Sequence, residues 1–196
     1  MRALLGLALL ALPIAACGED TTRTAAPSGS EPITARAVAA VTAEHLEQTP
    51  TAGRAEADDF GYRKPPVGAD LDLGRRGADG RLSVMVGTDY DERMLTCEGD
   101  WADVLDGCEE NYRGGTLMWQ EEEPEEDPGI LYYARRSGDA MVLVELGGPL
   151  VQGDPRDQDL VVPVDTMAAV ANDERLAALT TPEAVRAGEA LDWFRS

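Results

Sequence analysis

The sequence predicts an α+β fold: an N-terminal helix, an antiparallel β-meander of about five strands, and C-terminal helices. Two observations predict it. Helix-forming stretches lie at both ends of residues 34–196, and the part between them alternates apolar and polar residues with short turns. Strands joined by short turns favour antiparallel neighbours. Helices on either side of such a run are typical of a single domain whose sheet is covered on one face.

The first helix is expected over residues 35–48, where Val38, Val41 and His45 recur at helical spacing. We interpret His45, the only histidine of the chain, as a packing residue on that helix face. Residues 49–68 carry proline, glycine and charge without a clear period, which predicts a loop.

The expected strands fill the middle of the chain. They are residues 69–73, 81–87, 115–121, 130–136 and 140–146. Leu82, Val84 and Val86 fall on one face of the second strand, because alternate side chains of a strand point the same way. For the same reason the neighbours Tyr132 and Tyr133 must point to opposite faces of the sheet.

Two helices are expected after the strands. Asp165 is a suitable N-cap for a short helix over residues 166–172. A last helix is expected from Pro182 to Trp193, with Thr181 as its N-cap and proline at its first position.

The N-terminus has the features of a secretory signal. Arg2 provides the positive start, residues 3–12 carry no polar side chain, and small residues precede Cys17. An apolar stretch of about ten residues is half of the roughly twenty that a helix needs to cross a bilayer. We therefore expect export rather than a permanent transmembrane helix.

The end of that signal, Ile14-Ala15-Ala16-Cys17, resembles the bacterial lipobox of lipoproteins. The resemblance implies that residues 1–16 are removed as a lipoprotein signal peptide and that Cys17 receives a diacylglyceryl group. The lipid then holds the protein on the extracytoplasmic face of the cell membrane. Residues 17–33 become a lipidated cysteine and a flexible polar tether, and residues 34–196 a single domain. The alternative is an ordinary secretory signal with an incidental cysteine.

The charge of the chain limits its partners. With 17 basic and 37 acidic residues, its formal net charge is −20. Nucleic acid is disfavoured as a partner, because its binding depends on Lys and Arg side chains that neutralise phosphates. Anionic lipid headgroups also repel such a domain, so only the N-terminal lipid is expected to contact the membrane.

Two cysteines remain once Cys17 carries a lipid. Cys97 and Cys108 are the two that remain, and an even number of cysteines in an exported protein predicts a disulfide. The alternatives are a metal pair or a redox dithiol. The spacing is not C-x-x-C, and the histidine is distant in the sequence, so neither alternative is favoured.

One short segment is unusually acidic. Its carboxylates are Glu121, Glu122, Glu123, Glu125, Glu126 and Asp127. Such a segment is a candidate for capturing calcium, which prefers oxygen ligands, or for docking a basic protein partner. The alternative is a solvated loop whose charges repel one another. No D-x-[DN]-x-[DN]-G pattern supports a dedicated calcium site.

No motif for catalysis or for a cofactor is found. A hydrolase with a histidine base is disfavoured, since none of the serines lies within G-x-S-x-G and the chain has a single histidine. Neither a P-loop nor a G-x-G-x-x-G sequence is present. Paired carboxylates can support a glycosidase, but a chain with 37 acidic residues contains such pairs by chance.

The layout of residues 34–180 resembles that of uncharacterised small lipoproteins of actinobacterial type and of extracytoplasmic sensor-like domains. This resemblance implies no catalytic residues. The sequence therefore predicts a membrane-anchored lipoprotein that binds a partner or ligand, or senses conditions in the envelope, without catalysis. The alternatives are a carboxylate-dependent envelope hydrolase and a calcium-binding surface protein.

Overall fold

The computed structural model describes residues 30–56, 60–74, 80–98, 102–123, 129–148 and 151–195. Its strands are β1 (Glu31–Pro32), β2 (Ala52–Glu56), β3 (Val67–Asp72), β4 (Arg81–Gly87), β5 (Gly107–Tyr112), β6 (Gly115–Gln120), β7 (Ile130–Ser137), β8 (Ala140–Gly147), β9 (Leu179–Thr180) and β10 (Phe194–Arg195). Its α-helices are α1 (Ala35–Ala43), α2 (Val164–Ala171) and α3 (Pro182–Glu189). Its short 3-10 helices are η1 (Glu92–Leu95), η2 (Ala102–Val104) and η3 (Pro155–Asp157).

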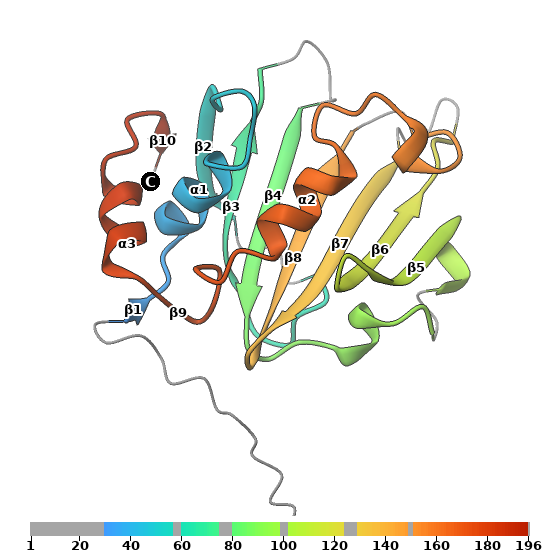
Figure 1. The fold of residues 1–196 in the computed structure, drawn as a ribbon, viewed down its shortest axis with the longest axis horizontal. Coiled ribbons are helices and arrows are strands. Elements are labelled where there is room, and N and C mark those ends of the chain that lie inside the picture. Colours follow the sequence, from blue (N-terminus) through green and yellow to red (C-terminus); the bar gives the residue numbers. More distant parts are fainter. Residues whose placement is uncertain are drawn as a thin grey trace, which may run out of the picture.

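Eight strands form one sheet in the order β10-β2-β3-β4-β8-β7-β6-β5. All neighbours are antiparallel except β10 and β2, which are parallel. The remaining two strands, β1 and β9, pair with each other. Figure 1 shows the three α-helices on one side of the large sheet.

The predicted five-strand meander with an N-terminal helix is therefore wrong, although the fold keeps an α+β character. The first described element is the strand β1, and the large sheet has eight strands. These eight strands are two antiparallel runs, β2 to β4 and β5 to β8, joined where β8 pairs with β4, together with the added strand β10. The strand β8 can take this central place because its side chains are mostly buried on both faces.

Two of the unexpected strands lack an alternating pattern. In β2 the residues that face the helices are Gly53 and Ala55, which are too small to stand out as apolar positions. In β5 the exposed residues Glu110 and Asn111 follow each other directly. Neither segment therefore shows the period of two that identifies a strand in a sequence.

The helix-covered face of the sheet holds the larger core. Leu82, Val84 and Val86 of β4 all point into it, as the alternation predicts, and α1 and α2 close it with residues such as Val38 and Met167. The α3 helix lies close against α1, because a side chain at Gly188 would meet the backbone of Arg36 about 2.5 Å away.

The opposite face is covered over part of its width by residues 60–66 and 88–98. These segments bury a second core, composed of Tyr62, Met85, Tyr90, Met94, Met118, Tyr132, Ala134, Met141 and Leu143. Tyr132 lies in this second core and Tyr133 in the larger one, which confirms that the two tyrosines point to opposite faces. The strands β10, β2 and β3 contribute no residue to the second core, so their half of this face stays open.

A disulfide fastens one of these covering segments to the sheet. Cys97, which follows η1, is bonded to Cys108 of β5, and their Cα atoms lie 5.7 Å apart. The predicted cysteine pair is thus present. A disulfide is compatible with an extracytoplasmic protein, since such bonds persist in oxidising compartments.

The helix ends agree in part with the sequence. Thr181 caps α3 as predicted, with its hydroxyl accepting a hydrogen bond from the Ala184 amide at 3.2 Å. That helix ends at Glu189, four residues before the expected end, and α1 ends at Ala43, before His45. Asp165 is not a cap: α2 begins at Val164. None of the described helices has the length and apolar character required to cross a membrane.

Candidate functional site

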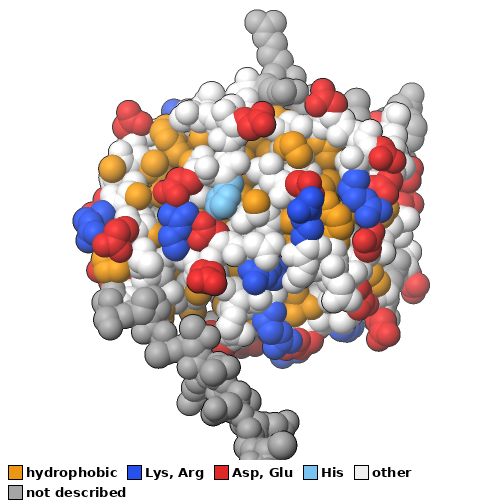
Figure 2. All heavy atoms as spheres, in the orientation of Figure 1, with side chains coloured by type: hydrophobic (Ala, Val, Ile, Leu, Met, Phe, Trp, Pro, Cys, Tyr) orange, Lys and Arg blue, Asp and Glu red, His pale blue; other side chains and the backbone are white. Residues whose placement is uncertain are grey.

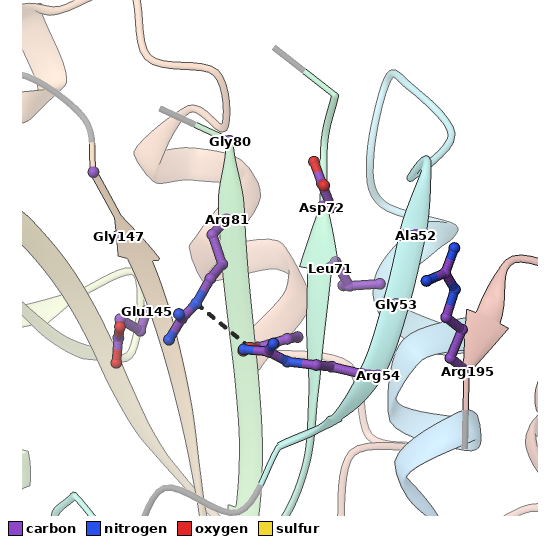
Figure 3. A pocket seen from close by; sticks show the side chains of 12 residues that line it. Ala52, Gly53, Arg54, Leu71, Asp72, Gly80, Arg81, Glu145, Gly147 and Arg195 are labelled. Carbon is purple, nitrogen blue, oxygen red and sulfur yellow. Dashed lines mark hydrogen bonds and ion pairs between the residues drawn. The ribbon is translucent and has the colours of Figure 1, made fainter. Parts of the chain in front are cut away.

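A groove of about 710 Å³ opens on the uncovered half of the sheet, on the face opposite the helices (Figure 3). It is lined by Ala52, Gly53, Arg54, Asp70, Leu71, Asp72, Gly80, Arg81, Glu145, Gly147, Gly148 and Arg195. All but two of these residues lie on the five strands β10, β2, β3, β4 and β8, and the other two, Gly80 and Gly148, adjoin β4 and β8. The groove therefore depends on the order of strands in the sheet and on no single segment.

One row of side chains crosses the whole sheet at this place. Register partners from β10 to β5 are Arg195, Arg54, Asp70, Ser83, Glu145, Tyr132, Met118 and Cys108. Side chains that are directly opposite on neighbouring strands lie about 5 Å apart at Cβ. The first five members are polar and belong to the open half of the face. The last three belong to the second core or pack against it.

The buried carboxylate of Asp70 is at the centre of the polar half. Its Oδ1 accepts a hydrogen bond from the Ser83 hydroxyl at 2.5 Å, and its Oδ2 accepts from Nε and Nη2 of Arg54 at 3.1 and 2.7 Å. Nε of Arg81 lies 3.5 Å from the same Oδ2. Burial alone would raise the pKa of Asp70. The hydrogen bonds with Ser83, Glu56 and Arg54, together with the charge of Arg81, outweigh burial and hold this pKa below its ordinary value.

Two guanidinium groups thus meet at one carboxylate oxygen. Figure 3 shows the side chain of Arg54 reaching across β3 toward Arg81. Asp70 is almost fully buried beneath them, while 62% of the Arg54 side chain and 51% of the Arg81 side chain are exposed. Both cations are therefore oriented by the protein and still accessible from the groove.

A third arginine lies at the edge of the groove. Arg195 of β10 is exposed and forms no ion pair within the described part of the chain. In Figure 3 its side chain points along the strand past Ala52, apart from the pair formed by Arg54 and Arg81.

Acidic groups occupy other parts of the lining. Asp72 is exposed at the end of β3, where its Oδ1 accepts a hydrogen bond from the Gly74 amide at 2.8 Å. Glu145 lies on β8, on the far side of Arg81 from Arg54 (Figure 3). The groove consequently presents both signs of charge, at separate positions.

A glycine leaves room between these groups. Among the described residues, a Cβ atom added at Gly147 would meet a single side-chain atom, Oε1 of Glu145, at the ordinary contact distance of 3.6 Å. By contrast, a Cβ atom at Gly53 would lie 2.5 Å from the Trp193 ring. Internal packing therefore does not require glycine at position 147, and the space above it belongs to the groove.

The residues singled out in the sequence lie elsewhere. Glu121, Glu122 and Glu123 follow β6, outside the groove lining, and the Glu121 amide donates to Asp106 Oδ2 at 2.7 Å. Glu125, Glu126 and Asp127 lie outside the described residues, as does Cys17. Within the described ranges, no three His, Cys, Asp or Glu side chains gather as a metal ion would require.

His45 hydrogen-bonds with a carboxylate beyond the end of α1, so it is not the helix-face packing residue that was predicted. It lies beyond the end of α1, and its Nε2 is 2.9 Å from Oδ2 of Asp173, which also pairs with Arg175. Burial raises the pKa of Asp173, but hydrogen bonds with Arg175 and His45 more than offset it and lower that pKa to about 2. Figure 2 shows the histidine among acidic and basic side chains on the helix-covered face.

The groove was not predicted from the sequence. A weak signal was available, since Asp70 and Asp72 alternate with Leu71 and Leu73 and must therefore lie on one face of β3. In comparisons with known proteins, no family model, no curated protein and no solved structure matches the chain.

Proposed function

We propose that this chain is an exported, lipid-anchored binding protein that takes up a small charged ligand in the groove. The anchor is the lipid on Cys17, supported by the resemblance of residues 14–17 to a lipobox. The ligand site is the groove around Arg54 and Arg81. We assign the domain a role in binding, without catalysis.

One observation supports the proposal of a ligand site in the groove. In a chain of net charge −20, two exposed guanidinium groups are fixed side by side by the buried Asp70. Guanidinium groups recognise carboxylate and phosphate through paired N–H donors. Because Arg54 and Arg81 are already held in place, a ligand loses less side-chain entropy when it binds them.

The same geometry favours binding over carboxylate catalysis. A carboxyl group that acts as a general acid needs a raised pKa, so that it keeps its proton near neutral pH. Asp70 is the most buried carboxylate of the groove, and its pKa is lowered instead. We therefore do not assign a hydrolase reaction to this site.

Titration calorimetry of the purified chain with inorganic phosphate, succinate and triglycine tests the ligand site. We expect at least one of the three to bind. Gly147→Phe should fill the groove and weaken that binding by about tenfold or more, whereas Gly147→Ala, which adds one methyl group, should change it little.

Two controls make this result specific. Arg186→Gln removes an exposed arginine of α3 that pairs with Glu183 at 2.7 Å, so it should leave binding unchanged. Thermal unfolding should show that Gly147→Phe is folded. If none of the three probes binds, or if Gly147→Phe binds as tightly as the unaltered chain, the proposal is wrong.

A further inference from the structure

The two arginines that meet at Asp70 use only part of their donors on it. Arg54 approaches Oδ2 of Asp70 with Nε and Nη2, at 3.1 and 2.7 Å, and Arg81 approaches the same oxygen with Nε at 3.5 Å. A guanidinium group has a second edge, formed by its two terminal nitrogens, that can also hold an oxyanion by paired hydrogen bonds. Oε2 of Glu56 lies 3.9 Å from Arg54 Nη2, which is too far for a hydrogen bond. Among the described residues, no hydrogen bond occupies the whole terminal edge of either arginine.

We infer that the ligand of this groove is a phosphate monoester of a small polar molecule, and that its phosphate group lies above Asp70 between Arg54 and Arg81. This inference rests on the proposed function, because it specifies the chemical class of ligand that the same groove takes. The arrangement of the donors, the local charge and the lining of the groove each support it.

The two guanidinium groups reach Asp70 from opposite sides. Arg54 is on β2 and Arg81 on β4, and β3, which carries Asp70, lies between these strands. A carboxylate is planar, and a single guanidinium edge satisfies both of its oxygens. A phosphate group has oxygens in three directions, so it can pair with one guanidinium on each side at the same time. Donors on both sides of Asp70 therefore favour phosphate over carboxylate.

The cations at this place outnumber the carboxylate that they share. Asp70 offsets only one of the two charges of Arg54 and Arg81. Arg195, the register partner of Arg54 on β10, adds a third cation on the same face and forms no ion pair within the described part of the chain. A monocarboxylate brings one negative charge, whereas a phosphate monoester brings about 1.5–2 at neutral pH. The more highly charged anion fits this part of the groove better.

The other carboxylates of the lining are turned or separated from the arginine pair. Asp72 accepts a hydrogen bond from the Gly74 amide at 2.8 Å, and in Figure 3 its carboxylate points toward the end of β3, away from the pair. Glu145 lies on the far side of Arg81, so the Arg81 side chain is between this carboxylate and the space above Asp70. An anion above Asp70 is therefore closer to the guanidinium groups than to these carboxylates.

The rest of the groove fits the organic part of such a ligand. Its volume of about 710 Å³ is typical of small-molecule sites and much larger than a phosphate ion needs. Residues with small or no side chains, among them Ala52, Gly80, Gly147 and Gly148, line the space beside the arginines. No aromatic side chain belongs to the described lining, although proteins commonly stack nucleotide bases on aromatic rings. The lining therefore favours a polar, non-aromatic body such as a polyol or a sugar.

Titration calorimetry with matched probes tests this ligand class. Glycerol 3-phosphate and glycerate carry a similar small diol on different anions, a phosphate ester and a carboxylate. Inorganic phosphate tests the phosphate group without a body, and succinate and triglycine are further carboxylates. Adenosine 5′-phosphate and the water-soluble dihexanoyl phosphatidic acid are phosphate monoesters with an aromatic and a lipid body. Each probe is titrated into the purified chain and into its variants.

We expect glycerol 3-phosphate to bind. Glycerate, succinate and triglycine should bind about tenfold more weakly, since a carboxylate group leaves one guanidinium edge unpaired. Inorganic phosphate should bind measurably but more weakly than glycerol 3-phosphate, because it makes no contact with the rest of the groove. The adenosine and lipid phosphates should bind no more tightly than glycerol 3-phosphate.

Two variants test the position of the phosphate group. Arg54→Lys keeps a positive charge beside Asp70 but removes the terminal guanidinium edge, so it should weaken glycerol 3-phosphate by about tenfold. Arg195→Gln leaves the contacts of Asp70 in place and removes only the third cation, so it should weaken this probe by about threefold to fivefold. Arg186→Gln on α3 is the matched control and should change nothing. Thermal unfolding shows whether each variant is folded, and Arg195→Gln decides the question should Arg54→Lys unfold.

Each contrary result has its own meaning. If glycerate, succinate or triglycine binds as tightly as glycerol 3-phosphate, the phosphate class is wrong, and the proposed function stands when Gly147→Phe weakens that binding. If the arginine variants bind glycerol 3-phosphate unchanged, its phosphate group does not lie above Asp70 and the inference is wrong. Tighter binding of the adenosine or lipid phosphate would contradict the polar, non-aromatic body. If no probe binds the unaltered chain, both proposals fail.

Discussion

Arg36 holds Phe194 in two ways. Its Nη1 donates a hydrogen bond to the Phe194 carbonyl oxygen at 3.0 Å, and its guanidinium carbon lies 5.2 Å from the centroid of the Phe194 ring. Other nitrogens of the same guanidinium donate to the carbonyl oxygens of Gly188 and Leu191. Because Arg195 follows Phe194 in β10, a contact on the helix-covered face fixes an arginine of the groove on the opposite face.

Replacing this arginine should destabilise the fold. We expect Arg36→Ala to lower the free energy of unfolding by about 3 kcal/mol, because partly buried carbonyl oxygens at and after the end of α3 lose a charged donor. Arg36→Lys should recover only part of the loss, since an ammonium group cannot reproduce the planar set of donors. Chemical denaturation measures both values. Arg186→Ala is the control, and an Arg36→Ala effect as small as that of the control would contradict the assignment.

The stability of the protein should fall in acid through Asp173. The pKa of Asp173 is lowered from 3.8 to about 2 in the folded chain. Its ionised form therefore stabilises the folded state at pH values above the pKa that Asp173 has in the unfolded chain. That contribution, about 2 kcal/mol, should be present above about pH 4 and disappear as the pH falls toward 2. Denaturant melts between pH 5 and pH 2 measure it. Asp173→Asn should be less stable at pH 5 and show a flatter decline.

Removing the disulfide should loosen the cover of the second core. The bond joins residues 11 positions apart, and closing a ring of this size stabilises a fold by about 3 kcal/mol in the chain-entropy estimate. The double variant with Cys97→Ser and Cys108→Ser should lose about this amount in denaturant melts. Adding a reducing agent should lower the stability of the unaltered chain similarly and leave the double variant unchanged. A reductant effect on the double variant would point to another cause.

Attachment to the membrane should depend on Cys17. In a bacterial host, the unaltered chain should incorporate a labelled fatty acid and sediment with membranes, because two acyl chains hold a protein stably on a bilayer. Cys17→Ala should incorporate no label. Cys97→Ser is the matched control, as it removes a different cysteine and should keep the label. Equal labelling of Cys17→Ala and the unaltered chain would refute the lipoprotein assignment.

Features that depend on neighbouring residues could be predicted from the sequence. The Thr181 cap, the face shared by Leu82, Val84 and Val86, and the bonded cysteine pair all follow from local spacing or from counting. The place of β8 between β4 and β7 could not be predicted in this way. It depends on a pairing between segments that are far apart in the chain, for which a single sequence carries no signal.

The groove was missed for a related reason. Arg54, Asp70, Arg81 and Glu145 come from four strands, and each taken alone is an ordinary charged residue on the solvent side of a strand. Arg54 also lies in β2, a segment interpreted from its glycine and charge as a loop. Arg54, Asp70 and Glu145 lie in one register row of the sheet, and Arg81 lies two residues along β4 from that row. This register is set by the assembled fold.

The parallel pairing of β10 with β2 also affects how the protein folds. It joins Phe194 to Gly53 and Arg195 to Arg54, residues near opposite ends of the described chain. Contacts between such distant residues form slowly, because a long loop must close before any bond is gained. A strand of two residues at a sheet edge is also the first to fray. We therefore expect the arginine end of the groove to open early in unfolding, and amide exchange at Gly53, whose N–H donates to the Trp193 carbonyl oxygen at 3.2 Å, to report it.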